Sequence, residues 1–368
     1  MSGAARQRTT TRPAGARPGP DGLAGVPRAV EPTSRTDFAS DEEVRWCPGC
    51  GDHAILSTLQ SVLPRLGVRR ENTVVISGIG CSSRLPYYMN CYGMHTIHGR
   101  APTLATGLAI TREDLAVFVV TGDGDALSIG ANHLVHALRR NVNLTILLLN
   151  NRIYGLTKGQ YSPTSPVGTV TKSSPDGSPD APLNPVSLAL GAGATFVART
   201  MDCDRSTLAA VLESAARHRG ASLVEIYQNC VVFNDGAHAA LRGPGSVEAL
   251  IPLRPGEPIR FGHDDHLGVV ADGNGGVRVA EVAETGPGAV LVHDPTLDDP
   301  SRAFALSRLT TSGATGRTAM GIFRDVARPA HDDRVRERIR RARATRAGEP
   351  DDDEALARLI AGTDSWLL

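Results

Sequence analysis

The chain has 368 residues, which is enough for about two domains. Hydrophobic residues make up 41% and charged residues 21%, as in globular proteins, and no apolar run approaches the roughly 18 residues of a membrane-spanning helix. Lys and Arg together balance Asp and Glu at 39 each, so the positive surplus typical of nucleic-acid-binding proteins is missing. We therefore expect neither a membrane nor a nucleic acid as a partner.

The beginning of the chain has the composition of a disordered tail. Residues 1–38 are rich in Arg, Pro, Gly and Thr without apolar periodicity, so they cannot bury enough surface to offset the entropy of ordering. An Arg-rich start would also suit an organellar transit peptide, although Pro and Gly would interrupt its helix. A secretory hydrophobic segment is missing, so we expect a cytoplasmic protein with reduced cysteines, in which Cys91 and Cys203 are core thiols.

Residues 39–240 alternate between short β-branched runs and helical stretches. This alternation predicts an α/β domain with a mostly parallel sheet and helices on both faces. Ligands bind beyond the carboxyl ends of the strands in such sheets, so we look for chemistry in the loops after residues 77, 121 and 150. The predicted strands span residues 73–77, 115–121, 144–150, 195–200 and 222–227, and the predicted helices span 54–63, 126–140, 186–191 and 206–218.

Two further regions differ in composition from this pattern. Residues 161–185 are rich in Ser and Pro and contain no regular element, which is typical of a functional lid or a flexible loop. Residues 241–368 are predicted to form a small α+β appendage. It would contain a hairpin around 272–276, a strand at 289–292, a charged helix over 332–346, and a solvent-exposed turn from His263 to His266.

A Gly-Asp-Gly turn follows the second predicted strand. Gly122-Asp123-Gly124 opens a helix there, and after 25 further residues Asn150 and Asn151 follow the next strand. Such a turn lets a diphosphate approach the free N–H groups of a helix N-terminus. Asp123, the Asn151 side chain and the carbonyl of Ile153 would then supply the oxygen ligands that Mg²⁺ prefers. An ordinary turn and an Asn cap are the alternative, but the full pattern resembles the thiamin-diphosphate motif of thiamin-dependent enzymes.

Four cysteines are expected at the same edge of the sheet. Cys47 and Cys50 form a C-x2-C pair, Cys81 follows the first predicted strand, and Cys230 follows the last. A pair with two distant single cysteines is typical of a four-thiolate metal site. The spacing leaves the metal open, because four cysteines bind Zn²⁺ as well as an iron–sulfur cluster.

Several motifs in fixed order resemble one family. They are WCPGCGDH, GIGCSSRLPYY, IHGRAPTLATGLA, VVTGDGDALSIGANHLVHALRRN, LLLNNRIYGLTKGQYSPTSP and QNCVVFNDGAH. Together they resemble the β subunits of the 2-oxoacid:ferredoxin oxidoreductases, most closely those of the bacterial 2-oxoglutarate:ferredoxin oxidoreductases. The resemblance covers residues 46–238.

The resemblance implies a thiamin-diphosphate-binding fold and a redox enzyme. It implies thiamin diphosphate and Mg²⁺ at the Gly-Asp-Gly and Asn-Asn positions and a [4Fe–4S] cluster on the four cysteines. By the same resemblance, a 2-oxoacid is oxidatively decarboxylated, coenzyme A takes the acyl group, and electrons pass singly through the cluster to ferredoxin. 2-Oxoglutarate, giving succinyl-CoA, is the expected substrate, and a pyruvate-type acid is the alternative.

The resemblance also implies a partner subunit. Thiamin catalysis needs a Glu that hydrogen-bonds the aminopyrimidine, and the family supplies this Glu from its α subunit. The chain has room for only one thiamin-type domain. We therefore expect a heterodimer or a dimer of heterodimers (a heterotetramer), and a single chain that is inactive alone.

Further residues match the family's pocket. Arg84 matches a basic position that meets the substrate carboxylate, with a surface Arg as the alternative. Lys158 is one of only two lysines in an Arg-dominated chain, which favours a functional role. His98 either contacts the cofactor or packs within its loop. The remaining residues expected beside thiamin are Cys81, Ser82, Leu156 and Thr157.

Two other functions are compatible with parts of the sequence. A non-redox thiamin-dependent decarboxylase subunit would keep the Gly-Asp-Gly and Asn-Asn motifs but has no use for convergent cysteines. A zinc-stabilised binding subunit without catalysis would keep the cysteines and tolerate the loss of Asp123. The sequence retains both sets, which favours the oxidoreductase.

Overall fold

The computed structural model describes residues 21–309, 317–345 and 352–362. Its centre is an eight-stranded sheet in the order β2-β1-β3-β4-β8-β7-β13-β9, parallel throughout except where β13 meets β7. The predicted fold class is confirmed. The strands are β1 (Thr73–Ser77), β2 (Tyr92–His95), β3 (Ala116–Gly122), β4 (Leu144–Asn150), β7 (Phe196–Met201), β8 (Ala221–Tyr227), β9 (Leu250–Leu253) and β13 (Thr318–Asp325).

The five strands at the centre agree with their predicted bounds to within one residue at each end. β1, β4, β7 and β8 are buried at every position, and β3 at all but its last residue. Burial of both faces explains why these segments are continuously apolar instead of alternating. The sequence analysis missed β2, because every residue of this edge strand is exposed, and it also missed β9 and β13.

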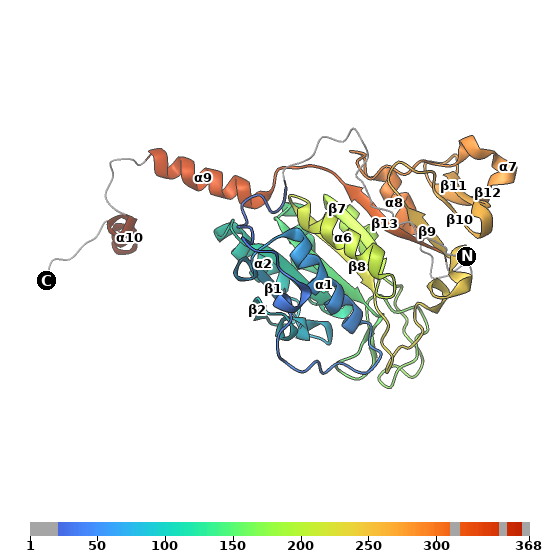
Figure 1. Ribbon diagram of the computed structural model, residues 1–368, viewed down its shortest axis with the longest axis horizontal. Coiled ribbons are helices and arrows are strands. Elements are labelled where there is room, and N and C mark those ends of the chain that lie inside the picture. The colour runs from blue at the N-terminus through green and yellow to red at the C-terminus, as the bar shows by residue number, and fades with distance from the viewer. Residues whose placement is uncertain (1–20, 310–316, 346–351, 363–368) are drawn as a thin grey trace.

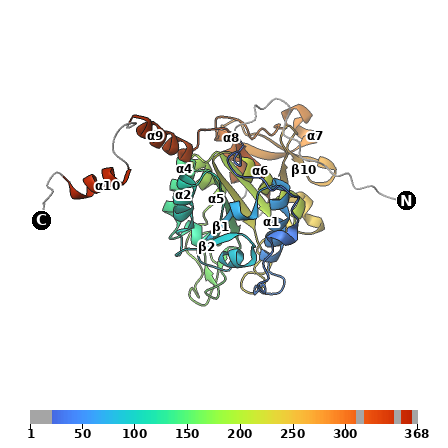
Figure 2. The same cartoon turned by 60° about the vertical axis from the view of Figure 1, so that its left-hand side comes forward.

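Helices cover both faces of the sheet, with one hydrophobic core layer on each side (Figure 1 and Figure 2). α1 (Asp52–Leu66) and α6 (Arg205–Arg217) pack on one face, and α2 (Ala101–Thr111), α4 (Ala131–Arg140) and α5 (Pro185–Gly191) pack on the other. The side chains of Asn184 and Asp204 accept hydrogen bonds from the first turns of α5 and α6, so each caps its helix.

The helix predicted over residues 126–140 is interrupted. α3 (Asp123–Leu127) ends before Ser128, and α4 begins only at Ala131. The loop before α2 crosses closely at this break, because a Cβ on Gly130 would lie 3.0 Å from the Cα of Gly99. The Gly-Asp-Gly turn therefore opens a short helix of its own.

Residues 21–38 are part of the folded structure. Leu23, Val26 and Phe38 are buried in the core layer that contains α1 and α6. The expected disordered tail is wrong for this segment, because three isolated apolar residues insert into the core without forming a periodic pattern. Residues 1–20 lie outside the described residues.

The C-terminal third is not a separate appendage, since β9 and β13 belong to the main sheet. The predicted hairpin is confirmed as β11–β12, and the charged helix as α9, but residues 289–292 form only isolated bridges. α9 and α10 extend away from the sheet, on the side opposite the small sheet (Figure 1). The remaining elements are β10 (Arg260–Phe261), β11 (Leu267–Ala271), β12 (Val277–Glu281), α7 (Val282–Thr285), α8 (Ser301–Arg308), α9 (His331–Thr345) and α10 (Asp352–Ala361).

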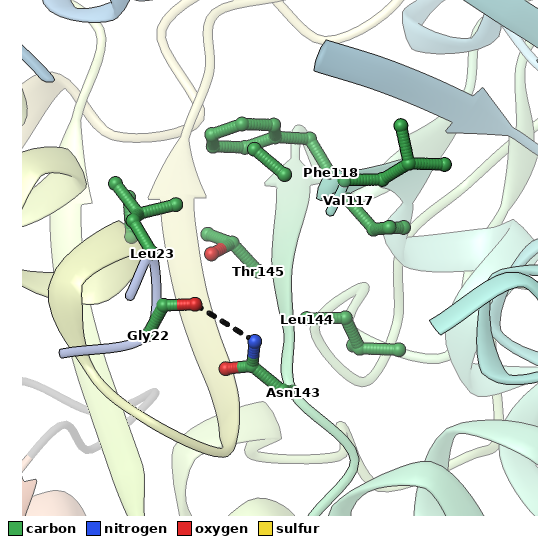
Figure 3. A pocket seen from close by; sticks show the side chains of 10 residues that line it. Gly22, Leu23, Val117, Phe118, Asn143, Leu144 and Thr145 are labelled. Atoms are coloured by element: carbon green, nitrogen blue, oxygen red, sulfur yellow. Dashed lines mark hydrogen bonds between the residues drawn. The ribbon is translucent and has the colours of Figure 1, made fainter. Parts of the chain in front are cut away.

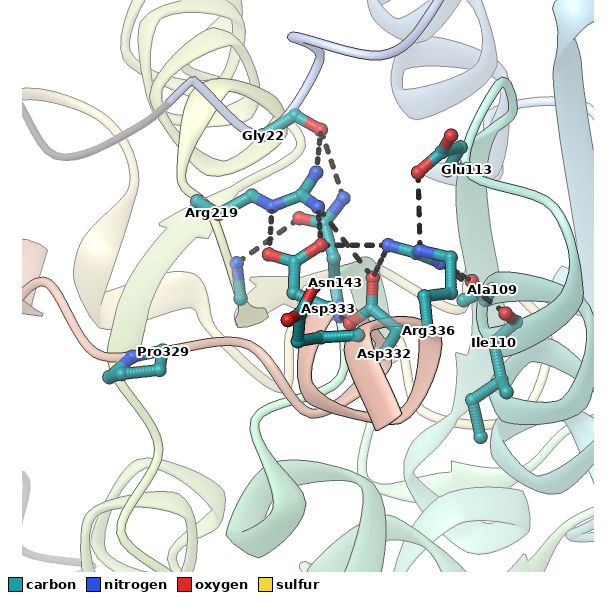
Figure 4. Close-up of polar contacts among 12 residues, drawn as sticks. Gly22, Ala109, Ile110, Glu113, Asn143, Arg219, Pro329, Asp332, Asp333 and Arg336 are labelled. Carbon is teal, nitrogen blue, oxygen red and sulfur yellow. Dashed lines mark hydrogen bonds and ion pairs between the residues drawn. The ribbon is translucent and has the colours of Figure 1, made fainter. Parts of the chain in front are cut away.

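The amino-terminal edge of the sheet is closed by two segments from distant parts of the chain. The Asn143 amide donates to the carbonyl of Gly22 beside a small pocket at the start of β3 and β4 (Figure 3). The first turn of α9 is held there by Arg219 and by ion pairs within α9 (Figure 4). Within the described residues, no helix has the length and apolar character to cross a membrane.

Candidate active site

The loops that follow β1, β3, β4 and β8 meet at the carboxyl-terminal edge of the sheet. Strand register places Gly122 beside Leu149, and Asn150 beside Tyr227. The predicted motifs lie at or just after these positions. The topology therefore brings them to one edge of the sheet, which is the edge where parallel sheets bind their ligands.

Asp123 is buried and lacks a cationic partner. Its Oδ2 accepts hydrogen bonds from Ser162 Oγ at 2.5 Å and from Thr164 Oγ1 at 2.6 Å. Burial raises the pKa of this carboxyl to about 6, although these two hydroxyls lower it. Among the described residues no Lys or Arg forms an ion pair with Asp123. A buried carboxylate without a counter-charge is unfavourable in a protein unless it binds a cation, so the residue fits Mg²⁺.

Asn150, rather than Asn151, is connected to Asp123. Thr164 Oγ1 lies 2.9 Å from Asn150 Oδ1 and 2.6 Å from Asp123 Oδ2 and shares its single proton between the two oxygens, and the Asn150 amide donates to Glu225 Oε1 at 2.7 Å. The side-chain oxygen of Asn151 accepts from the N–H of Ile153 at 3.1 Å, within the same loop. Asn150 therefore connects the end of β4 to β8 and to Thr164. The side chain of the proposed ligand Asn151 bonds within its own loop.

The loop between β4 and β6 (Gln160–Tyr161) lies directly against the Gly-Asp-Gly turn. The hydroxyl of Tyr154 donates to the carbonyl of Gly124 at 3.0 Å, and the hydroxyl of Ser82 lies close to Gly122. Arg152 adopts a left-handed backbone with φ of 57°, which a non-glycine residue keeps only where its surroundings hold it. The turn, Ser82 and this loop thus form one continuous wall.

Asp125 connects two loops and the end of β3 around the site and was missed by the sequence analysis. Its carboxylate accepts from the backbone N–H groups of Ile79 and Gly99, and from the hydroxyl of Thr121. It also contacts His98 Nδ1 at 2.6 Å. This contact holds His98 at the same edge as the Gly-Asp-Gly turn, and its contact with the cofactor stays a prediction.

The residues predicted for the substrate pocket lie on exposed or half-exposed surfaces. Leu156, Thr157 and Lys158 are exposed in the turn between β5 (Ile153–Tyr154) and β6 (Gln160–Tyr161), and Lys158 has a φ of 76°. Arg84 is half-buried, and its Nε donates to the hydroxyl of Tyr88 at 3.0 Å, which raises the pKa of the guanidinium. The three turn residues are open to a partner molecule.

The four predicted cysteines lie near one another, all without disulfides. Burial raises the pKa of the Cys81 thiol to about 11, and the charges of Asp52, Cys230 and Cys47 raise it further. Burial, Asp52, Cys230 and Cys81 likewise raise the pKa of Cys50. Each of the four cysteines is thus within electrostatic reach of at least one other.

The geometry of the thiols does not by itself identify a metal. Among the described residues, no group of three or more His, Cys, Asp or Glu side chains is arranged so that it could hold a metal ion. The sulfurs of Cys81 and Cys230 both lie beside Gly155, where a Cβ would stand 3.5 Å from one and 3.6 Å from the other. In a four-iron cluster each cysteine binds a different iron, so its thiolates surround a wider space than the ligands of one ion.

The cysteine region and the Asp123 region share one loop. Gly155 faces two of the cysteine sulfurs, and Tyr154 beside it contacts the Gly-Asp-Gly turn. Asn234, four residues after Cys230, donates from its amide to the carbonyl of Asn151 at 2.8 Å. A cofactor at one region would therefore lie next to a cofactor at the other.

Residues 78–226 match the model of the thiamine pyrophosphate enzyme, C-terminal TPP binding domain. This part of the chain therefore has the fold of a thiamin-diphosphate-binding domain. The solved 2-oxoglutarate:ferredoxin oxidoreductase from Magnetococcus marinus, with 2-oxoglutarate, coenzyme A and succinyl-CoA bound, superposes with a TM-score of 0.70 and 32% identity. That alignment covers 90% of this chain and 98% of that chain.

Curated relatives narrow the class to one family. The 2-oxoglutarate oxidoreductase subunit KorB of Mycobacterium tuberculosis is 59% identical over 343 residues, 93% of this chain and 91% of the relative. The 2-oxoacid:ferredoxin oxidoreductase 1 subunit beta of Aeropyrum pernix is 45% identical over 201 residues, 55% of this chain and 62% of the relative. The chain belongs to the β subunits of the 2-oxoacid:ferredoxin oxidoreductases, as the motifs predict, and is a subunit of an oxidoreductase.

The structure adds residues that the sequence analysis did not select. Asn150 and Asp125 stand next to selected positions, and the second acidic residue of the Gly-Asp-Gly-Asp run is a signal that was available. Ser162 and Thr164 lie at the end of one quoted motif, in a segment whose composition indicates only a loop. Gln228 is the first residue of the motif QNCVVFNDGAH, but its contact with a cysteine 178 residues earlier cannot be seen in the sequence.

Proposed function

We propose that this chain is the β subunit of a 2-oxoglutarate:ferredoxin oxidoreductase, which forms succinyl-CoA from 2-oxoglutarate and coenzyme A. The observation that carries the proposal is the shared loop, since residues 150–155 contact both the buried Asp123 region and the cysteine sulfurs. Thiamin-dependent decarboxylation and one-electron transfer need their two centres side by side. The similarity to relatives named for 2-oxoglutarate supports this substrate over a pyruvate-type acid.

The Asp123 region would hold Mg²⁺ and the diphosphate of thiamin diphosphate. Asp123 would supply a carboxylate oxygen, with Asn151 and the Ile153 carbonyl as further ligands, and the N–H groups of α3 would face the diphosphate. The Asn151 side-chain oxygen accepts one hydrogen bond, from the Ile153 N–H, and its second lone pair would serve the cation. Ser162 and Thr164 keep one oxygen of Asp123 in place.

Cys47, Cys50, Cys81 and Cys230 would hold the [4Fe–4S] cluster. Bound thiamin diphosphate would supply the carbon nucleophile for decarboxylation, and the cluster would accept electrons one at a time for ferredoxin. The half-buried setting of three of these thiols, two of which lie beside Gly155, fits such a group.

Exposed side chains around this edge would complete the substrate pocket together with the α subunit. Lys158 and Arg84 carry the positive charge that a dicarboxylate substrate needs, and Leu156 and Thr157 would form the wall beside thiamin. His98 would direct its free ring nitrogen at the cofactor, because Asp125 holds the other one. Neither subunit alone would contain every catalytic group, so we expect a heterodimer or a dimer of heterodimers.

Metal and cofactor analysis of the anaerobically purified complex with its α subunit tests the proposal. We expect about four irons and four acid-labile sulfides per β chain, as a cubane cluster requires, together with one thiamin diphosphate. Stoichiometric zinc without sulfide would contradict the redox assignment and leave the thiamin fold intact. Turnover of 2-oxoglutarate by the β chain alone would contradict the assignment of a partner that completes the site.

A pair of cysteine variants locates the cluster. Cys230→Ser should lose most of the iron and the visible absorption, because it removes one of the four proposed ligands. Cys91→Ser is the matched control, since Cys91 lies outside the proposed set and packs against the core layer of α1. Equal iron content in both variants would contradict the assignment of Cys230.

A further inference from the structure

A buried glutamine lies between the two halves of the site. Gln228 directly follows β8 and is 1% exposed. Its backbone N–H donates to the carbonyl of Asn150 at 3.0 Å. Its side-chain Nε2 lies 3.1 Å from Cys50 Sγ and 2.8 Å from the carbonyl of Asn229. One residue therefore contacts both the strand end of the thiamin region and a cysteine.

The orientation of the Gln228 amide follows from its neighbour. The backbone carbonyl of Asn229 can only accept, so the nitrogen of the amide must face it. The second hydrogen of that nitrogen is then available to the sulfur of Cys50. The reversed amide would place two oxygens 2.8 Å apart.

The oxygen at the other end of the amide is left without a hydrogen bond. Gln228 Oε1 is buried and has no hydrogen-bond partner in the part of the chain that the structure describes. An unpaired buried acceptor is unfavourable and rare. The Asn229 carbonyl fixes the nitrogen in spite of this cost, and the same nitrogen is thereby held 3.1 Å from the sulfur of Cys50.

Hydrogen bonds to cysteine sulfurs are among the factors that set the reduction potential of iron–sulfur clusters. An N–H group stabilises negative charge on the sulfur, and reduction adds one electron to the cluster and its ligands. The bond therefore favours the reduced form and raises the potential. We propose that Gln228 is a positioning residue that raises the reduction potential of the cluster through its hydrogen bond to Cys50. This inference rests on the proposed function, since it requires the cluster at the four cysteines.

The test is a redox titration of the cluster in the complex with the α subunit, followed by electron paramagnetic resonance. Gln228→Met keeps the length of the side chain but removes the donor. Its midpoint potential should fall below that of the parent protein, with iron, sulfide and thiamin diphosphate contents unchanged. Gln228→Leu is a second variant without a donor and should shift the potential in the same direction.

Gln60→Met is the matched control. Gln60 is also buried, at 5% exposed, but its amide donates to the carbonyl of Tyr88 at 2.9 Å and not to a sulfur. Replacing it should lower the melting temperature of the complex without moving the midpoint potential. A potential that moves equally in the Gln228 and Gln60 variants would show a general packing effect and would overturn the inference.

The remaining outcomes are also decisive. A loaded Gln228→Met cluster with the parent's potential would overturn the inference while the proposed function stands. Loss of the cluster from both Gln228 variants at an unchanged melting temperature would overturn it too, because Gln228 would then build the site and not tune it. Failure of the proposed function is recognised separately, in the parent protein, by the lack of iron and sulfide.

Discussion

Buried aspartates lie at both edges of the central sheet, and they differ in what surrounds their carboxylates. At the amino-terminal edge, Asp332 and Asp333 meet Arg219 and Arg336, and Arg336 pairs with both (Figure 4). At the carboxyl-terminal edge, Asp123 receives hydroxyl and backbone donors but no ion pair among the described residues. One edge is neutralised by its own side chains, and the other leaves a negative charge without a partner.

The pKa values separate the two edges in the same way. Burial alone would raise the pKa of Asp333, but Arg219 and Arg336 together outweigh it, so the pKa lies below its usual value. Burial of Asp123 is opposed only by hydroxyl and backbone hydrogen bonds, and its pKa is raised to about 6. A neutralised cluster serves to attach α9 to the sheet, whereas an unneutralised carboxylate is a cation ligand.

The largest effect is expected from removing the unneutralised charge. Asp123→Ala, in the complex with the α subunit, should lower 2-oxoacid oxidation by more than about a hundredfold, because loss of even an outer partner of a metal ligand costs 10–100-fold. Rates per folded complex measure this. Asp333→Ala is the control at the opposite edge and should keep most of the activity. Similar losses in the two variants would erase the distinction between the edges.

The opposite edge should affect stability instead. Arg336→Ala leaves the buried carboxylate of Asp332 without the guanidinium it contacts at 2.7 Å, and also removes a bond to the carbonyl of Ala109. We expect the free energy of unfolding to fall by about 2 kcal/mol, less than for a fully buried pair that loses its only partner, because Arg219 still lies 3.9 Å from Asp332 and the N–H of Asn143 still donates to it. Chemical denaturation measures this. Unchanged stability, or a loss of thiamin diphosphate binding of the same size, would contradict a purely structural role.

The two edges also differ in how far the sequence alone predicts them. Continuous apolar strands and the Gly-Asp-Gly turn are local patterns, so the central sheet and the position of Asp123 follow from them. Contacts between distant segments leave no such pattern. Thr164 lies in a stretch whose composition indicates only a loop, and Phe38 is an isolated apolar residue before the first helix. The sequence also does not show which side chain, that of Asn150 or that of Asn151, points towards Asp123. This depends on the path of the backbone, which has a left-handed residue, Arg152, directly after them.

The pH dependence should separate ligand binding from folding. Cation binding needs the carboxylate form of Asp123, so protons compete below about pH 6, and the apparent Kd for Mg²⁺ with thiamin diphosphate should rise about tenfold per pH unit there. The pKa of Asp333 lies below 3.8, so its stabilising contribution is complete above that pH and is lost only as the pH falls further.

Binding titrations and thermal melts between pH 7 and pH 4 compare the two responses. The difference in stability between the parent protein and Arg336→Ala should stay constant over this range, while cofactor affinity falls. Asp123→Asn cannot titrate and reveals the part of the pH effect that belongs to the diphosphate itself. A parent protein whose affinity follows the Asp123→Asn profile would contradict a ligand role for Asp123.

The smallest effect concerns the hydroxyls that replace a counter-charge at Asp123. Thr164→Val removes one donor that contacts both Asp123 and Asn150, so we expect a loss of about 1 kcal/mol in cofactor binding, roughly fivefold in Kd. The Thr164 hydroxyl lowers the pKa of Asp123, so its removal should also move the pH midpoint of binding upward. Thr169→Val is the control, because its hydroxyl bonds to Pro166 in the same loop. An upward shift in Thr164→Val alone would show that these hydroxyls stabilise the carboxylate form.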